Sequence, residues 1–144
     1  MIFVNISAVL VLTALIAGPL LIAKNMAKVA GVKSESKFLV VSQIEKFPNL
    51  ALTQRDNAYS ISYTKQGPAQ AYIGVLIVNN PTETTQTYTI ERISGEAQPF
   101  FGEDLGSQLT KISVPSQASV PISILSDTVS QTQTVEFRIQ VDWL

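Results

Sequence analysis

The sequence predicts an α+β chain overall, in which a long N-terminal apolar α-helix precedes a C-terminal antiparallel β-sandwich. The first 23 of the 144 residues carry no charge, and all ten Lys and Arg residues follow them. From residue 38 onward the chain is instead rich in Thr, Ser and Gln, and its apolar residues alternate with polar ones, which is typical of half-buried strands. We therefore expect two domains, 1–36 and 37–144.

The N-terminal segment reads MIFVNISAVLVLTALIAGPLLIA over residues 1–23. As a helix rising about 1.5 Å per residue it spans roughly 34 Å, which is enough to cross the hydrocarbon core of a bilayer. A cleaved secretory signal is disfavoured, because no basic residue precedes the apolar run. A plain membrane anchor meets a different difficulty, because the positive-inside rule would keep Lys24, Lys28, Lys33 and Lys37, and hence the sandwich, in the cytoplasm.

About seven strands are expected after this helix. The run 71–78 is continuously apolar, which predicts a central strand covered on both faces. Tyr59, Ile61 and Tyr63 alternate with Ser and Thr, which predicts a strand buried on one face. The expected strands are 38–47, 57–65, 70–80, 85–93, 109–115, 119–125 and 134–144, with 109–115 and 119–125 forming a hairpin. Short strands at this spacing are typical of an immunoglobulin-like (Ig-like) sandwich.

A long loop is expected around residues 99–106. Its Phe100 and Phe101 are interpreted as filling the core, with a contact to another subunit as the alternative. Glu103 and Asp104 lie next to each other in this loop and could hold Ca²⁺. The loop lacks the alternating Asp and Asn ligands of a dedicated calcium loop, so a solvated turn is favoured.

The composition argues against enzyme chemistry. The chain has no Cys, which excludes disulfides and thiolate sites, and no His, which removes the usual general base and the commonest transition-metal ligand. Its eleven carboxylates show no motif spacing, and no Gly-rich loop cradles phosphate. With a net charge of −1 and dispersed basic residues, the sequence does not predict a basic surface for binding nucleic acid. We expect a non-enzyme without cofactor, metal, small-molecule substrate or nucleic-acid partner.

In its layout the chain resembles the archaeal type IV pilins and archaellin-like filament subunits. The resemblance rests on an apolar helix that begins at Met1, a Lys-bearing continuation to about Ser36, and a small β-sandwich. Gly18 and Pro19 are similar to the helix-loosening residues of such segments, while Asn5 stands where many bacterial pilins carry Glu. The resemblance implies an extracellular filament at the cell surface, used for adhesion. Its partners are identical subunits, and each subunit is held in the membrane before assembly.

The resemblance also assigns roles within the N-terminal helix. Asn5, Ser7 and Thr13 are polar exceptions that hydrogen-bond across helices, or for Ser7 and Thr13 to the preceding helical turn. Gly18 and Pro19 are its flexible positions. The apolar residues expected to pack in the filament core are Ile2, Phe3, Val4, Ile6, Val9, Leu10, Leu12, Leu15, Ile16, Leu20, Leu21 and Ile22.

The arrangement of an N-terminal helix followed by a sandwich also fits a second class of protein. The chain could be a single-span, membrane-anchored accessory or stator-like subunit of a membrane or cell-surface complex. A filament subunit packs its helix against identical copies, whereas an accessory anchor keeps most of the helix in lipid. A filament built by donating an N-terminal strand is disfavoured, because Pro19 and the length of the apolar run do not fit a short alternating strand.

Overall fold

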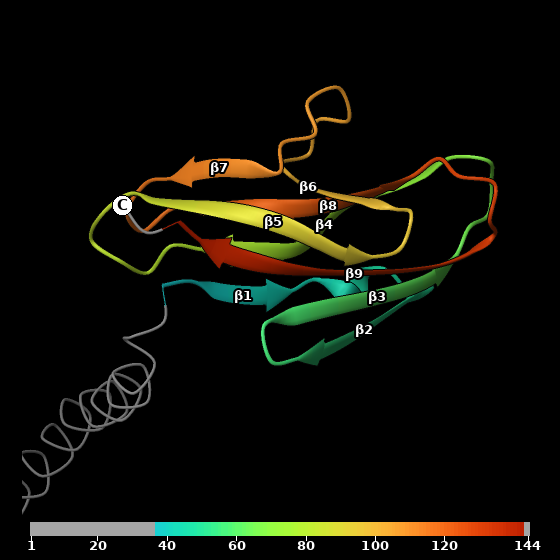
Figure 1. Cartoon of the computed structure of the whole chain (residues 1–144), viewed down its shortest axis with the longest axis horizontal. Coiled ribbons are helices and arrows are strands. Elements are labelled where there is room, and N and C mark those ends of the chain that lie inside the picture. Colours follow the sequence, from blue (N-terminus) through green and yellow to red (C-terminus); the bar gives the residue numbers. More distant parts are fainter. Residues whose placement is uncertain (1–36, 143–144) are drawn as a thin grey trace, which may run out of the picture. The chain divides into compact units, whose positions relative to one another are not determined.

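The computed structural model describes residues 37–142, which fold into two antiparallel β-sheets (Figure 1). One sheet has four strands in the order β1-β4-β8-β6, and the other has five in the order β2-β3-β9-β5-β7. The elements are β1 (Leu39–Ser42), the 3₁₀ helix η1 (Ile44–Lys46), β2 (Leu50–Arg55), β3 (Ala58–Thr64), β4 (Gln70–Asn79), β5 (Gln86–Ser94), β6 (Gln98–Phe101), β7 (Lys111–Val114), β8 (Ser119–Ser126) and β9 (Thr132–Val141).

The predicted α+β class is wrong. The residues that the structure describes are nearly all strand, and their only helix is the three-residue η1. That prediction depended on the apolar helix of domain 1–36, which lies outside the described residues. Within residues 37–142, no helix has the length and apolar character needed to cross a membrane.

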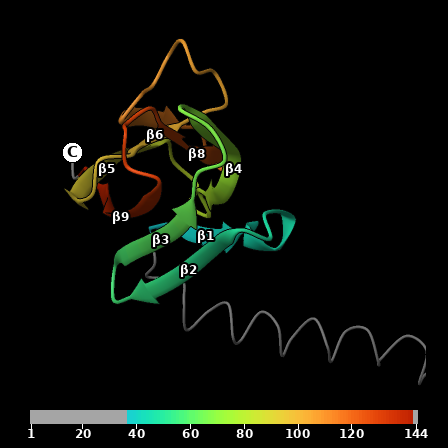
Figure 2. The same ribbon diagram turned by 90° about the vertical axis from the view of Figure 1, so that its right-hand side faces the viewer.

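The strands with strict alternation are confirmed. Tyr59 and Ile61 of β3 lie opposite Phe137 and Val135 of β9, and all four side chains are buried. Side chains from both sheets form one core cluster, so the sheets pack face to face as a sandwich (Figure 2). The remaining core residues include Tyr63, Tyr72, Val75, Leu76, Val78, Tyr88, Ile90, Phe101, Ile122, Ile124 and Ile139.

Residues 37–142 form nine strands instead of about seven, because two short edge strands, β2 and β6, were not expected. In β2 only Leu50 and Leu52 pack toward the core, and Asp56 turns the chain into β3 with a positive φ of 53°. In β6 a proline, Pro99, pairs with Ile124. An edge strand tolerates proline because one side of it needs no ladder hydrogen bond. The first predicted strand is also too long, since β1 ends at Ser42 before η1 begins.

The predicted hairpin of 109–115 and 119–125 is wrong. β7 pairs with β5 in the five-stranded sheet, whereas β8 pairs with β4 and β6 in the four-stranded sheet. The turn between them therefore crosses from one sheet to the other. The backbone of Asn80 fixes this crossing, because its carbonyl accepts from Gln117 N at 3.0 Å and its N–H donates to Ala118 O at 2.9 Å.

The loop expected around residues 99–106 is partly strand. Phe100 and Phe101 belong to β6 and are completely buried, so the core-filling interpretation is confirmed and the alternative of a subunit contact is wrong. Glu103 and Asp104 lie exposed after β6. The Oδ1 atom of Asp104 accepts a hydrogen bond from Gly106 N at 2.9 Å, which stabilises its own turn.

Gly95 lies in the connection between β5 and β6, where the chain crosses from one sheet to the other. Its φ is +94°, and a Cβ atom at this position would lie 2.3 Å from Thr134 O and 2.8 Å from Val135 Cα. Both are backbone atoms of β9, which cannot move without disturbing the centre of the five-stranded sheet. We expect Gly95→Ala to lower the free energy of unfolding by about 3 kcal/mol or more.

Chemical unfolding of the full-length chain, followed by near-ultraviolet circular dichroism, measures this loss. Gly67→Ala is the matched control, because its φ is not positive and the nearest atom to its Cβ position lies 3.8 Å away. We expect the control to be neutral or to stabilise by up to about 1 kcal/mol. Equal effects of the two substitutions would contradict the predicted clash.

The side chain of Asn80 provides a second test of the fold. Its Nδ2 group donates to the carbonyls of Thr84, Val114 and Pro115 at 2.8, 2.9 and 3.0 Å, and the residue is 1% exposed. Replacing it with alanine leaves these carbonyls without their donor. We expect Asn80→Ala to destabilise by about 2–4 kcal/mol in the same unfolding measurement. Asn79→Ala, which removes only a hydrogen bond to Ser119 at the surface, should cost no more than about 1 kcal/mol.

Candidate interaction surface

All the site residues predicted from the sequence fall between Ile2 and Ile22, outside the described residues. The structure therefore places none of them. Within the described part, the two outer faces of the sandwich differ in chemical character. This difference defines the candidate site.

The outer face of the five-stranded sheet is polar. Hydroxyl pairs join neighbouring strands, with Oγ of Ser62 and Oγ1 of Thr134 at 2.9 Å. Ion pairs add to them, with Arg138 Nε and Glu91 Oε2 at 3.2 Å. A second ion pair brings Lys111 Nζ within 2.5 Å of an Asp142 carboxylate oxygen, and the hydrogen bond from Lys111 lowers the pKa of that carboxyl group. Such a face is suited to contact with water.

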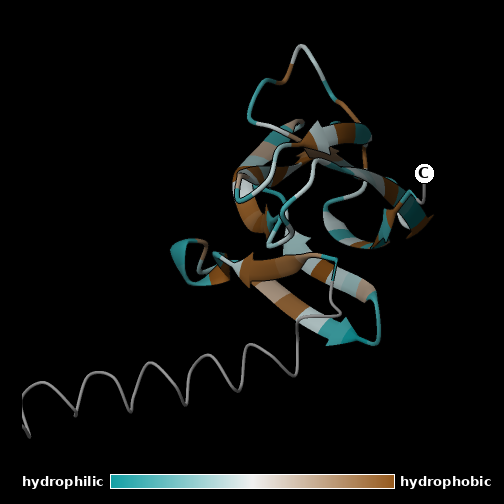
Figure 3. Ribbon diagram, turned by 90° about the vertical axis from the view of Figure 1, so that its left-hand side faces the viewer, coloured by the Kyte–Doolittle hydropathy of each residue, from teal (hydrophilic) through white to brown (hydrophobic). Residues whose placement is uncertain are grey.

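The outer face of the four-stranded sheet is apolar. Val41 of β1, Ile77 of β4 and Pro121 of β8 form one row across three adjacent strands. Leu39 and Val41 are 42% and 46% exposed, and Ile73 is 37% exposed. The strand β1 is coloured as hydrophobic along most of its length in Figure 3. We call the residues Leu39, Val41, Ile73, Ile77, Pro121 and Leu125 the apolar face.

Strand β4 explains how this face arises. It lies between β1 and β8, as expected for a central strand. However, the described residues do not bury both of its faces, as the sequence had predicted. A bulge at Gly74, with φ of 67°, turns both Val75 and Leu76 into the core and leaves Ile73 and Ile77 on the outer side. Antiparallel sheets that face water on one side normally place polar residues there. Contiguous exposed apolar positions are typical of surfaces that contact another protein or a membrane.

The apolar face begins where the N-terminal segment joins the sandwich. The carbonyl of Lys37 accepts a hydrogen bond of 2.7 Å from the hydroxyl of Tyr88, and the ring of Phe38 packs edge-on against Tyr88 with centroids 5.8 Å apart. Tyr88 is completely buried, and burial raises its pKa to about 12. These contacts anchor the chain directly before β1. The start of the described chain, at Lys37 and Phe38, is thus held by a residue of the buried core.

The sequence contained a signal for this surface that strand-by-strand interpretation missed. The consecutive apolar residues 39–41 and the uninterrupted run 71–78 both put apolar side chains on two faces of a strand. The run was expected to be covered within the domain, whereas the described residues cover only its inner side.

No protein-family model, curated protein or solved structure matches this chain. Among residues 37–142, no group of three or more His, Cys, Asp and Glu side chains is arranged to hold a metal ion.

The anchor at Tyr88 predicts a loss of stability in alkali. The unfolded chain ionises this phenol near pH 10, whereas the folded chain keeps its proton until about pH 12. Between these values the folded state binds more protons, so the free energy of unfolding falls as the pH rises. The contribution of one such group is at most about 1.4 kcal/mol per pH unit.

Chemical unfolding of the full-length chain at pH 8, 10 and 11 tests this dependence. Tyr88→Phe should be less stable at pH 8, because it lacks the bond to Lys37, but it should lose less stability on going to pH 11. A shallower slope should remain in the variant, because burial also raises the pKa values of Tyr59, Tyr63 and Tyr72. Identical slopes for both proteins would contradict the role assigned to Tyr88.

Proposed function

We propose that this chain is a structural subunit of an extracellular type IV pilus-like filament. In this proposal the apolar N-terminal segment holds the subunit in the membrane before assembly and then packs against identical copies. The sandwich forms the outer wall, where it serves surface attachment, and the subunit carries no catalytic activity. The observation that supports this function best is the contrast between the polar outer face and the apolar face, which begins at the strand directly after the N-terminal segment.

The contrast fits the two environments of a filament subunit. A subunit in a filament wall meets solvent on one side and neighbouring subunits on another. The Ser62–Thr134 pair and the Arg138–Glu91 ion pair suit the solvent side. The row Val41–Ile77–Pro121 suits a side that is covered by a further copy of the chain.

The apolar face also supplies a driving force that the N-terminal segment lacks. Moving an apolar segment from lipid into a protein core brings little hydrophobic gain, because both environments are apolar. Side chains of the apolar face leave water when a second copy covers them, which contributes about 25 cal/mol per Å² of apolar area. In the proposed assembly, contacts between sandwiches therefore favour the polymer over the isolated subunit in the membrane.

Electron microscopy of material sheared from cells that produce the full-length chain tests the proposal. We expect filaments whose main component, identified by mass spectrometry, is this chain. Recovery of the chain only in the membrane fraction, in fixed ratio with other proteins, would overturn the proposal and establish the anchored accessory subunit instead.

A charge on the apolar face should block assembly without unfolding the sandwich. Val41→Glu places a carboxylate at the β1 end of the row, at a side chain that is already 46% exposed in the subunit. Burying that charge against a second copy is strongly unfavourable. We expect at least a tenfold decrease in sheared filaments, a rough factor that corresponds to about 1.4 kcal/mol, while the circular dichroism of the subunit stays unchanged.

Thr53→Glu is the matched control. Thr53 is exposed on the outer face of the five-stranded sheet, where an added carboxylate stays in water. This variant should assemble like the unmodified chain. Normal filament yield from Val41→Glu would show that the apolar face is not a contact between subunits.

A further inference from the structure

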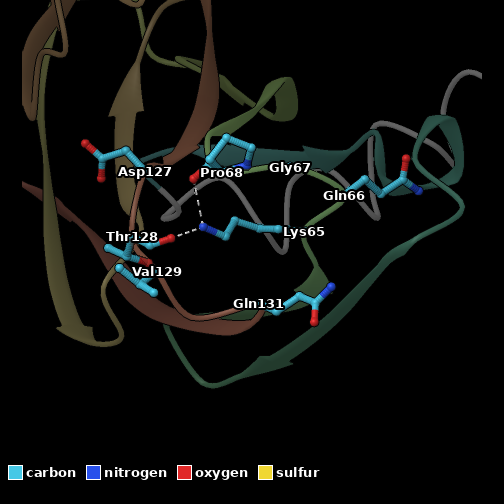
Figure 4. Close-up of a pocket in the computed structure, with 8 residues that line it drawn as sticks. All are labelled: Lys65, Gln66, Gly67, Pro68, Asp127, Thr128, Val129 and Gln131. Atoms are coloured by element: carbon cyan, nitrogen blue, oxygen red, sulfur yellow. Dashed lines mark hydrogen bonds between the residues drawn. The ribbon is translucent and has the colours of Figure 1, made fainter.

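A pocket lies at the end of the sandwich where β3 leads into β4 and β8 leads into β9. It is formed by the loops 65–69 and 127–131, and its volume is about 450 Å³ (Figure 4). This is within the range of about 300–1,000 Å³ that small-molecule sites occupy. The pocket contains none of the residues of the apolar face.

A buried lysine forms the base of the pocket. Lys65 is 4% exposed, and its Nζ atom donates to Pro68 O at 3.1 Å and to Thr128 O. The described residues form two ion pairs, and neither of them includes Lys65. Figure 4 shows the ammonium group between the two loops, with the carboxylate of Asp127 directed away from it. The positive charge is therefore compensated within the described part by neutral carbonyl groups only.

This arrangement favours an anionic ligand. A buried charge is costly unless an opposite charge or several hydrogen bonds compensate it. An ammonium group has three N–H donors, and two of those of Lys65 are directed to carbonyl oxygens. The third has no hydrogen-bond partner within residues 37–142. A carboxylate in the pocket forms a charge-assisted hydrogen bond, which is about twice as strong as a neutral one.

The rest of the lining favours a ligand that is rich in hydroxyl groups. Gln66 and Gln131 are exposed, and their side-chain amides form no hydrogen bond within residues 37–142. Figure 4 shows that the side chain of Gln66 points away from the ammonium group of Lys65. Each amide offers both a donor and an acceptor, which is what a hydroxyl group pairs with. The apolar contribution is limited to Pro68 and Val129, and no aromatic residue lines the pocket. An aromatic or aliphatic ligand would find little to pack against.

We propose that this pocket binds a carboxylate-bearing sugar, such as a hexuronate unit. The ammonium group of Lys65 pairs with the sugar carboxylate, and the amide of Gln131 binds its hydroxyl groups. Asp127 lines the same pocket and repels the anion, so it weakens the binding. The position of the pocket on two loops at one end of the sandwich leaves it open to a saccharide chain.

Nuclear magnetic resonance titration of the full-length chain in detergent solution tests the proposal, with glucuronate and galacturonate as probes. Glucose and galactose are the uncharged controls, and acetate is the control for a simple carboxylate. We expect saturable shifts at residues of the two loops with the hexuronates, at least about tenfold weaker binding of acetate, and no binding of the neutral sugars. Equal binding of acetate, or binding of glucose, would overturn the assignment of an acidic sugar.

Three substitutions locate the site. Lys65→Met should weaken hexuronate binding by at least about tenfold, and Gln131→Ala should weaken it severalfold. Asp127→Asn should instead strengthen it severalfold, because it removes a negative charge from the pocket. The last two residues are exposed, so these variants test the site even where Lys65→Met unfolds the loops. Unchanged or weaker binding by Asp127→Asn contradicts the proposed orientation of the carboxylate.

Discussion

The buried side-chain amide of Asn80 is the interaction on which the rest of the sandwich depends. It donates to carbonyls before β5, at the end of β7 and just after β7, while its oxygen accepts from the backbone and hydroxyl groups of Thr82. One residue at the end of β4 therefore holds the turn into β5 and the crossing from β7 to β8. Without that crossing, β8 could not lie beside β4. The amide thus stabilises the crossing that places β8 beside β4 in the four-stranded sheet.

The opposite end of the sandwich is held by a polar group of different character. Lys65 ties the β3–β4 loop to the β8–β9 loop, as Asn80 ties the turns at the other end. The side-chain amide of Asn80 is neutral, and both its NH₂ group and its oxygen form hydrogen bonds within the sandwich. Lys65 carries a charge that carbonyl dipoles compensate only partly, and it borders a pocket that is open to solvent. This difference separates a structural clamp from a site that retains binding capacity.

The sequence predicted those strands whose two faces meet different environments. Residues 57–65 and 134–144 alternate because one side of each strand faces solvent. β3 lies within the first range, whereas β9 (Thr132–Val141) begins two residues before the second; its Val135, Phe137 and Ile139 are buried as expected. The sheet to which a strand belongs was not predictable, since β7 and β8 show the same local pattern as a hairpin. Their separation is decided by Asn80, which is 34 residues away from Val114. The α+β class failed for another reason: it was based on residues outside the part that the structure describes.

The apolar face links the fold of the sandwich to the proposed assembly. A four-residue edge strand with Leu39 and Val41 exposed is a liability for an isolated sandwich in water, because it invites association. Such a feature is tolerable where association is the function. The same strand follows the anchor of Lys37 on Tyr88, so its start is joined to the buried core of the sandwich. In the proposed filament, the strand that is anchored on Tyr88 therefore also carries Leu39 and Val41 of the face that meets the neighbouring subunit.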